Sequence, residues 1–435
     1  MSPVEFGFYS LGLVVVLIAI RVPIGVAVGL VGFLGVVALR NVNVAFGLLK
    51  TIPFELAANW SLSAIPMFLV MGAVAHQTGI SEALFRAARL WLSRLPGGLA
   101  VAANFACAGF AAASGSSVAT AAAMGRLAIP EMLRHGYDRG LATGVVASAG
   151  TLGSMIPPSI LFVLYGVFAE VSITKLLIAG ILPGLLTAAI YAVMIVTRCT
   201  LSPGLAPSVH EETPWHERMT ALLSVWPLLA IIIGIIGGLY SGLTTPTEAG
   251  AFGALLTLVV ALLQGRLTLR ILWTSALESV INTSRIFFIA FNAIILTKFL
   301  ALTGLPIFLG AQIGDWALDP LLLVIATSII YIVLGMFLDP LGLMLITLPV
   351  LLPMFEALHL DLIWLGVLVV KYLEIGLITP PVGFNVHVIK GVMGDEVELE
   401  EIFKGVTWFL LCEAIVLVLL VAFPQISLFL PNLSG

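Results

Sequence analysis

Apolar segments separated by short polar stretches run along almost the whole chain. Each is long enough to form a helix that crosses a lipid bilayer or enters it. A polar linker at 201–222 divides the segments into two groups of six, and we therefore predict an all-α polytopic membrane protein. The segments lie near residues 4–20, 24–39, 56–78, 98–125, 140–168 and 175–197, and then near 223–241, 246–264, 280–301, 320–352, 362–390 and 402–423.

Two of these segments are interrupted by glycines and a Pro-Pro pair. Residues 150–159 read GTLGSMIPPS, and residues 374–383 read EIGLITPPVG. A proline lacks the amide hydrogen that a helix needs, and it disfavours helical geometry in the residue before it. Irregular backbone at membrane depth is tolerated where it is buried in protein or lines a cavity. The two breaks are therefore candidate binding sites.

The two breaks belong to an internal duplication with an offset of 223 residues. We predict one repeat at 1–200 and a second at 223–435. The offset superimposes Pro23 on Pro246, Pro130 on Pro353, Pro157 on Pro380 and Pro158 on Pro381.

Lysine and arginine positions indicate that the two repeats are inverted in the membrane. The loop after the third segment holds Arg86, Arg89 and Arg94, whereas the equivalent loop at 304–319 holds no lysine or arginine. Because cytoplasmic loops are enriched in these residues, the two loops are expected on opposite faces. Inverted repeats need an odd number of crossings each, so one segment per repeat must enter and leave by the same face.

The fourth segment of each repeat is the best candidate for such a re-entrant hairpin. Residues 98–125 are rich in alanine, glycine and serine, with a turn expected at 113–117, and the equivalent turn is expected at 335–340. This gives ten crossings and two hairpins, with both termini outside and the linker at 201–222 inside. We predict scaffold segments at 1–78 and 223–301. The hairpins and broken helices are predicted at 98–168 and 318–390.

Composition excludes several classes of function. The 435 residues are 60% hydrophobic and 10% charged, with a net charge of −4 and no basic cluster that would suit nucleic acid. No P-loop, HExxH or nucleophile-elbow motif is present, so ATP-driven transport and proteolysis lack support. An intramembrane Ser/Lys or Ser/His hydrolase is the alternative from another class, but the serine-rich hairpin has no lysine or histidine. A channel is a second alternative, although inverted broken helices favour a transporter that works by alternating access. The three cysteines are read as small core residues.

Two hairpin tips and two broken helices are expected to converge near the midplane. The breaks expose carbonyl groups, and nearby hydroxyl groups add oxygen ligands of the kind that Na⁺ favours. Small residues also let helices pack closely, so close packing is an alternative explanation for each serine considered alone. The hydroxyl residues are Ser114, Ser116, Ser117, Thr151, Ser154, Ser159 and Thr379.

A few charged residues lie within the apolar segments. Asp339 is placed at the second tip, where it is either a functional carboxylate or a helix cap before Pro340. Lys371 and Glu374 are three residues apart and are expected to pair with each other. Arg285 can bind a carboxylate or extend to the interface, and the sequence leaves this open.

These motifs resemble the large membrane subunit of tripartite ATP-independent periplasmic (TRAP) transporters, over nearly the whole chain. The residues that carry the resemblance are ASGSSVAT at 113–120, IPEM at 129–132, GYD at 136–138, the two breaks, AGILPG at 179–184 and TPTEA at 245–249. Lys371 departs from the family's pattern.

The resemblance implies Na⁺-coupled symport of an organic acid by an elevator motion. The substrate classes implied are C4-dicarboxylates, sugar acids such as sialic acid, and keto acids. It also implies a bacterial inner-membrane location, where the termini placed outside by the predicted topology would be periplasmic. No cofactor besides Na⁺ as coupling ion is expected, and two partners are implied. These partners are a small four-helix membrane subunit and a periplasmic substrate-binding protein. The runner-up is a stand-alone Na⁺/divalent-anion symporter.

The resemblance also assigns site residues. The Na⁺-binding residues implied are Ser114, Gly115, Ser116, Ser117, Thr151, Gly153, Pro157, Asp339, Gly376, Thr379 and Pro380. The substrate-binding residues implied are Ser116, Ser154, Pro158, Ser159, Pro381, Gly383 and Asn385.

Overall fold

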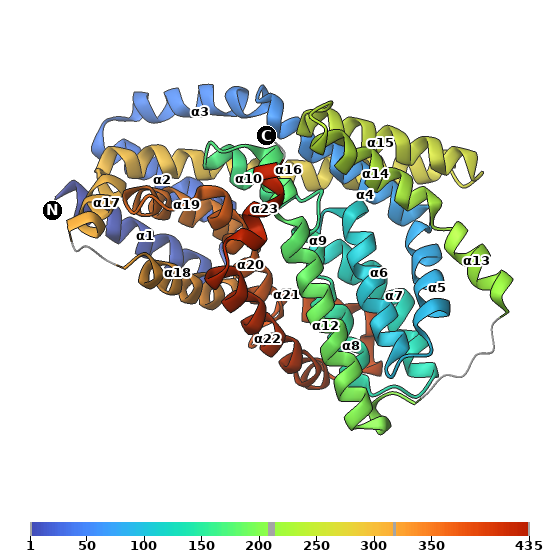
Figure 1. Cartoon of the computed structure of the whole chain (residues 1–435). Coiled ribbons are helices and arrows are strands. Elements are labelled where there is room, and N and C mark those ends of the chain that lie inside the picture. The colour runs from blue at the N-terminus through green and yellow to red at the C-terminus, as the bar shows by residue number, and fades with distance from the viewer. Residues whose placement is uncertain (1, 208–213, 316–318, 434–435) are drawn as a thin grey trace.

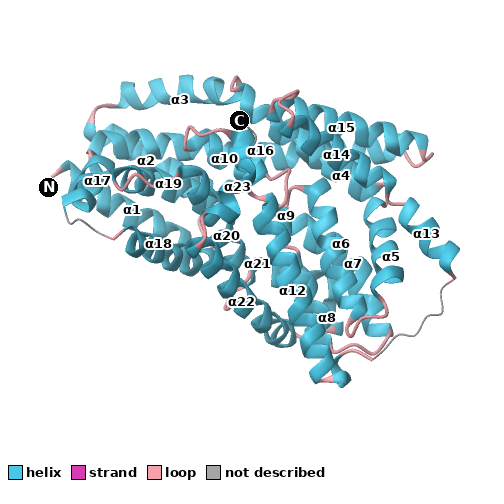
Figure 2. Cartoon of the chain, viewed as in Figure 1, coloured by secondary structure: helices cyan, strands magenta, loops and turns pink. Residues whose placement is uncertain are grey.

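The regular structure is helical throughout the part of the chain that the computed structural model describes, residues 2–207, 214–315 and 319–433 (Figure 2). The predicted linker at 201–222 falls partly outside these residues. The first half contains α1 (Pro3–Ala19), α2 (Ile24–Leu39), α3 (Val42–Ala57), the 3₁₀ turn η1 (Trp60–Ser63), α4 (Ala64–Gln77), α5 (Ile80–Leu92), α6 (Gly98–Ser114), α7 (Ser117–Arg134), α8 (Arg139–Ala149), α9 (Leu152–Met155), α10 (Ile160–Phe168), α11 (Ile173–Ala179) and α12 (Ile181–Leu201).

The second half follows the short 3₁₀ turn η2 (Pro203–Leu205). Its helices are α13 (Trp215–Leu223), α14 (Trp226–Tyr240), α15 (Pro246–Leu263), α16 (Leu269–Thr303), α17 (Leu305–Asp315), α18 (Pro320–Gly335), α19 (Pro340–Ala357), α20 (Leu362–Ile378), α21 (Phe384–Met393), α22 (Leu399–Ala422) and α23 (Gln425–Leu433), with η3 (Gly394–Glu396) between α21 and α22.

The helix order follows the offset of 223 residues. Shifted by that number, α7 at 117–134 becomes 340–357, the bounds of α19, and α2 at 24–39 becomes 247–262, close to α15 at 246–263. The division into repeats, and their opposite orientation across a membrane, remain predictions.

Many of these helices suit a membrane. Among the described residues, five are each long and apolar enough to cross one, and up to eight spans result if each bent helix pair counts as one. The chain is therefore an all-helical multi-span membrane protein.

One helix was missed by the sequence prediction. Residues 42–57 form α3, which meets η1 and α4 at a bend of 58°. In the second half the equivalent stretch is one continuous helix, since α16 runs without interruption for 35 residues and begins at Leu269 rather than near 280. Polar residues such as Lys50 and Arg270 break the apolar run in these stretches, although they are compatible with a helix.

The two hairpins and the two breaks lie where the sequence predicts them. The helices α6 and α7 meet at 114–117, and α18 and α19 meet at 335–340. The first broken helix bends by 42° between α8–α9 and α10, and the second is interrupted between α20 and α21.

The two halves are interleaved around these elements. The helix α21 packs on the first hairpin helix α7, while α10 packs on α19 of the second hairpin and on α20. Figure 1 shows α20 and α21 between the group that contains α1, α2, α18 and α19 and the group that contains α6, α7, α8 and α12. The long helix α16 contacts α2, α4 and α19. Residues 364–378 of α20 are all buried, so its charged residues face protein.

Candidate functional site

Both hairpin tips line one cavity of about 520 Å³. Ser154 reaches it from the first break, Glu374 comes from α20, and Arg285 comes from α16. Parts of both halves that lie far apart in the sequence therefore share a single site. The cavity is also lined by Gly115, Ser116, Ser117, Val118, Glu278, Asn282, Asp339, Pro340, Leu341 and Leu377.

The first tip depends on a glycine that touches the first break. Gly115 has φ of +62°, a conformation that side chains with a Cβ rarely adopt. A Cβ added there would lie 2.8 Å from the carbonyl oxygen of Pro158. Next to it, the Ser116 hydroxyl accepts a hydrogen bond from the Ala119 amide at 3.4 Å and caps α7. The tip and the break are therefore packed together as one unit.

Ser117 is the centre of a buried group of oxygen atoms. Its Oγ lies 2.6 Å from Glu374 Oε2, 2.8 Å from Ser154 Oγ and 3.3 Å from the Thr151 carbonyl oxygen. The predicted cation ligands Ser117 and Thr151 are thus brought together with Ser154, which was assigned to the substrate. Glu374 joins them from the other half of the chain. The sequence alone predicts Glu374 only as a partner for Lys371.

The second tip uses its carboxylate to cap a helix. Asp339 accepts hydrogen bonds from the Leu341 amide at 3.0 Å and the Gly342 amide at 3.2 Å, one on each oxygen. The capping interpretation of Asp339 is therefore what the structure shows, although the residue also lines the cavity. The tip lies close to α20, since a Cβ on Gly376 would lie 2.8 Å from the backbone carbonyl carbon of Gly335.

Several predicted site residues contact neighbours elsewhere. Ser159 caps α10 by accepting from the Phe162 amide, and the Thr379 hydroxyl donates to the Ile375 carbonyl at 2.6 Å. Asn385 is fully buried and donates to the Ala147 carbonyl at 3.2 Å. The predicted residues that do not line the cavity are Ser114, Thr151, Gly153, Pro157, Pro158, Ser159, Gly376, Thr379, Pro380, Pro381, Gly383 and Asn385.

The expected pairing of Lys371 with Glu374 is wrong. The Lys371 ammonium lies 2.5 Å from a carboxylate oxygen of Glu413 on α22, and it donates to the Thr187 hydroxyl of α12 at 3.0 Å. Tyr191 of α12 donates to the other oxygen of Glu413. The partner of Lys371 is therefore set by the packing of α20 against α12 and α22, which a local spacing rule cannot foresee.

The helix α16 contributes the part of the site that sequence reasoning largely missed. Glu278, Asn282 and Arg285 recur at spacings of four and three residues, which places them on one face of the helix. Glu278 and Asn282 also line a neighbouring cavity of about 310 Å³ with His76 and Arg126. The spacing was the available signal, because it places all three polar side chains on the same face of the helix.

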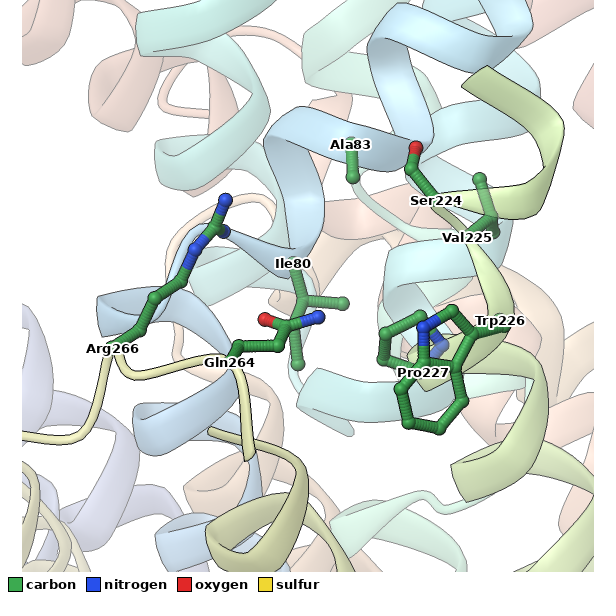
Figure 3. Close-up of a pocket in the computed structure, with 8 residues that line it drawn as sticks. All are labelled: Ile80, Ala83, Ser224, Val225, Trp226, Pro227, Gln264 and Arg266. Atoms are coloured by element: carbon green, nitrogen blue, oxygen red, sulfur yellow. The ribbon is translucent and has the colours of Figure 1, made fainter. Parts of the chain in front are cut away.

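A third cavity of about 230 Å³ lies away from the tips. Figure 3 shows Arg266 and Gln264 on one side of it and Trp226 with Pro227 on the other. It is lined by α5, by the bend between α13 and α14, and by residues that follow α15. The Arg266 guanidinium donates to the Thr78 carbonyl at 2.8 Å. This cavity contains none of the predicted site residues.

Among the described residues, no hydrogen bond joins a serine of the first tip to a lysine or a histidine. Ser117 contacts Ser154 and Glu374, and Lys371 pairs with Glu413. The described residues that line the cavity of about 520 Å³, called the main cavity below, include neither lysine nor histidine.

Comparison with known proteins identifies the family. A profile of the family described as "Tripartite ATP-independent periplasmic transporter, DctM component" matches residues 11–426. A C4-dicarboxylate TRAP transporter large permease protein of Pseudomonas aeruginosa is 38% identical over 385 residues, 88% of this chain and 88% of that protein.

A longer relative supports the same family, and a solved structure supports the fold. The isethionate TRAP transporter permease protein DctMQ of Oleidesulfovibrio alaskensis is 32% identical over 91% of this chain, which spans 61% of that protein. The crystal structure of the Alcanivorax borkumensis YdaH transporter, at 16% identity, has a similar fold with a TM-score of 0.61. The similarity covers 89% of this chain and 90% of that one. The chain therefore belongs to the DctM family of TRAP transporter large permease subunits and is a transporter component, not an enzyme.

Proposed function

We propose that this chain moves an organic acid across a bacterial inner membrane by Na⁺-coupled symport. The observation that carries this proposal is the cavity of about 520 Å³, which is lined both by the hydroxyl residues of the first tip and by Arg285 of α16. Oxygen ligands suit a hard cation such as Na⁺, and a guanidinium suits a carboxylate. One cavity can thus accommodate the coupling ion and an anionic substrate together.

Two features support an organic anion as the substrate. Arg285 lines the cavity and makes no ion pair with a described residue, so its guanidinium is available to a ligand. The names of the relatives refer to C4-dicarboxylates and isethionate, which carry carboxylate or sulfonate groups. The binding protein that delivers the substrate selects among such acids.

We infer an elevator motion in which hairpins and broken helices move together past α16 and its neighbours. The close packing of Gly115 on Pro158 and of Gly376 on Gly335 supports movement of each tip with its break. The amphipathic helix α5 is a suitable connecting arm, and its Arg89 pairs with Glu131 of α7.

Two partners complete the proposed system. The relative named DctMQ is longer than this chain, and its name includes a second component, which supports a small membrane subunit as a partner. We expect that subunit to pack on 4–78 and 223–301, with a periplasmic binding protein docking from outside. Genes for both partners are expected beside this one.

Uptake by reconstituted protein tests the proposal. Radiolabelled organic acid should accumulate in vesicles only with an inward Na⁺ gradient and with both partners present. Replacement of Na⁺ by K⁺, or omission of either partner, should abolish accumulation. Full uptake by the chain alone would instead favour the stand-alone Na⁺/divalent-anion symporter.

A further inference from the structure

Three charged side chains are buried together in the centre of the molecule. Lys371 and Glu374 on α20 and Glu413 on α22 are each 1% exposed. Lys371 is paired with Glu413, so their charges compensate. The ionised Glu374 would leave one negative charge without a paired cation. An uncompensated carboxylate in a membrane interior is costly, and such residues usually serve a function.

Glu374 is also incompletely hydrogen-bonded. Its Oε2 accepts from the Ser117 hydroxyl at 2.6 Å, whereas its Oε1 is buried and has no hydrogen-bond partner among the described residues. Buried polar atoms are normally paired, and an unpaired one calls for an explanation such as an absent ion. The residue lines the main cavity, so an ion can reach its vicinity.

The oxygen atoms near Glu374 form a suitable set for a hard cation. Ser117 Oγ, Ser154 Oγ and the Thr151 carbonyl oxygen are neutral, and all three come from the first half of the chain. The carboxylate comes from the second half. Hard cations favour such mixtures of carboxylate, carbonyl and hydroxyl oxygen.

We propose that the Glu374 carboxylate is the charged ligand of a Na⁺ site at the first hairpin tip, which it forms with Ser117, Ser154 and the Thr151 carbonyl. The inference rests on the proposed Na⁺ coupling and places the formal charge of that coupling at the first tip. It differs from the expectation that the first tip binds Na⁺ through neutral groups alone. Both carboxylate oxygens of Asp339, in contrast, already accept backbone hydrogen bonds.

Such a site gives Na⁺ a direct influence on the substrate cavity. The ion would add a further connection between α20, the start of α7 and the first break, which the hydrogen bonds of Ser117 already link. Ser116, Ser117 and Ser154 also line the cavity, so an ion that orders them also orders the surface that meets the substrate. Na⁺ bound at Glu374 is thus positioned to promote binding of the acid.

The test is a Na⁺ titration of thermal stability on the purified full chain, with choline chloride keeping the ionic strength constant. A ligand that binds the folded state raises the unfolding temperature in proportion to its saturation. Glu374→Gln should raise the half-saturating Na⁺ concentration by about tenfold or more, because it removes the charge next to the ion. Glu374→Asp should lie between Glu374→Gln and the parent.

A matched control lies on the same helix. The double variant Lys371→Met with Glu413→Gln removes two buried charges and leaves the net charge unchanged. It should shift the overall stability but keep the half-saturating Na⁺ concentration within about twofold of the parent. Ser154→Ala removes one neutral ligand and should raise that concentration by a few fold. This variant is the one to use if Glu374→Gln does not fold.

The outcomes separate this inference from the proposed function. If the parent responds to Na⁺ and Glu374→Gln titrates in the same way, the inference is wrong while Na⁺ coupling stands. The same conclusion follows if Ser154→Ala has no effect, or if Glu374→Gln loses a pH dependence but keeps its Na⁺ affinity, which would indicate a proton. If the parent does not respond to Na⁺, both the inference and the proposed coupling fail.

Discussion

Ser117 Oγ and Glu374 Oε2 lie 2.6 Å apart, although their residues are separated by 257 positions in the chain. Ser117 is the first residue of α7 and Glu374 lies in α20, so this hydrogen bond joins the first hairpin to the second broken helix. It is the clearest sign that the two halves build one site.

Replacement of Arg285 by glutamine should raise the KM for the organic acid. Loss of a charge-assisted hydrogen bond costs about 1.5–3 kcal/mol, which corresponds to about tenfold or more in affinity. Arg270→Gln is the matched control, because Arg270 lies on the same helix and does not line the cavity. Equal KM values for the two variants in vesicle uptake would exclude Arg285 as a substrate ligand.

Gly115→Ala should abolish most transport. Its φ of +62° is unfavourable for alanine, and the added Cβ would lie 2.8 Å from the Pro158 carbonyl oxygen. Gly237→Ala serves as the control, since a Cβ at that position meets nothing within 4 Å. Uptake should be compared at matched amounts of folded protein. Normal uptake by Gly115→Ala would show that the first tip tolerates displacement from the first break.

Asp339→Asn should preserve stability but shift the Na⁺ dependence of uptake to higher concentration. Asparagine is about as good an N-cap as aspartate, so α19 should remain capped. The change removes a formal charge from the cavity wall. The shift should be smaller than that of Glu374→Gln, because Asp339 already accepts two backbone hydrogen bonds. An unchanged Na⁺ curve would leave Asp339 as a cap only.

Lys371→Met alone should destabilise the protein strongly. It leaves the Glu413 carboxylate buried without its cation, which typically costs about 3–5 kcal/mol. Adding Glu413→Gln should recover most of the free energy of unfolding, since the pair is then replaced by uncharged groups. Unfolding in detergent, measured for both single variants and the double variant, gives the coupling energy. Additive effects would show that the pair does not act as a unit.

Cysteine labelling should place α5 and α17 on opposite faces of the membrane. In a background without the three buried native cysteines, Arg86→Cys and Ala311→Cys each add a thiol at an exposed position. The excess of arginine around α5 predicts a cytoplasmic location for it, and the absence of lysine and arginine at 304–319 predicts the outside for α17. Labelling of both from the same side would contradict the inverted repeat.

The sequence predicted those parts of the fold that depend on local chemistry. The hairpin turns at 114–117 and 335–340 and the breaks at the Pro-Pro pairs are set by glycine and proline, whose effects on the backbone are local. The helix α3 and the start of α16 were missed because their polar residues obscure the apolar run. No local pattern identifies the partner of Lys371, since Glu413 lies 42 positions away on another helix.

The candidate site was predicted only in part, because some of its contacts are local in sequence and others depend on how distant helices pack. The serines of the first tip are recognisable next to a break, and Ser117 with Thr151 do lie together. Glu374 was assigned to a neighbour three residues away, whereas its hydrogen bond depends on how α20 packs against the first hairpin. The sequence left the role of Arg285 open, because only the folded structure shows that α16 lines the same cavity as both tips.

Protection of a cysteine in the cavity tests most directly whether the tips bind both ligands. Ala119→Cys places a thiol at an exposed position that lines both neighbouring cavities, and Thr200→Cys at the exposed end of α12 is the control. Labelling of Ala119→Cys should slow when Na⁺ and the transported acid are added together, and not when K⁺ replaces Na⁺. The control should label at a constant rate. Equal labelling of Ala119→Cys in all conditions, or protection by the acid without Na⁺, would contradict a shared site for the ion and its substrate.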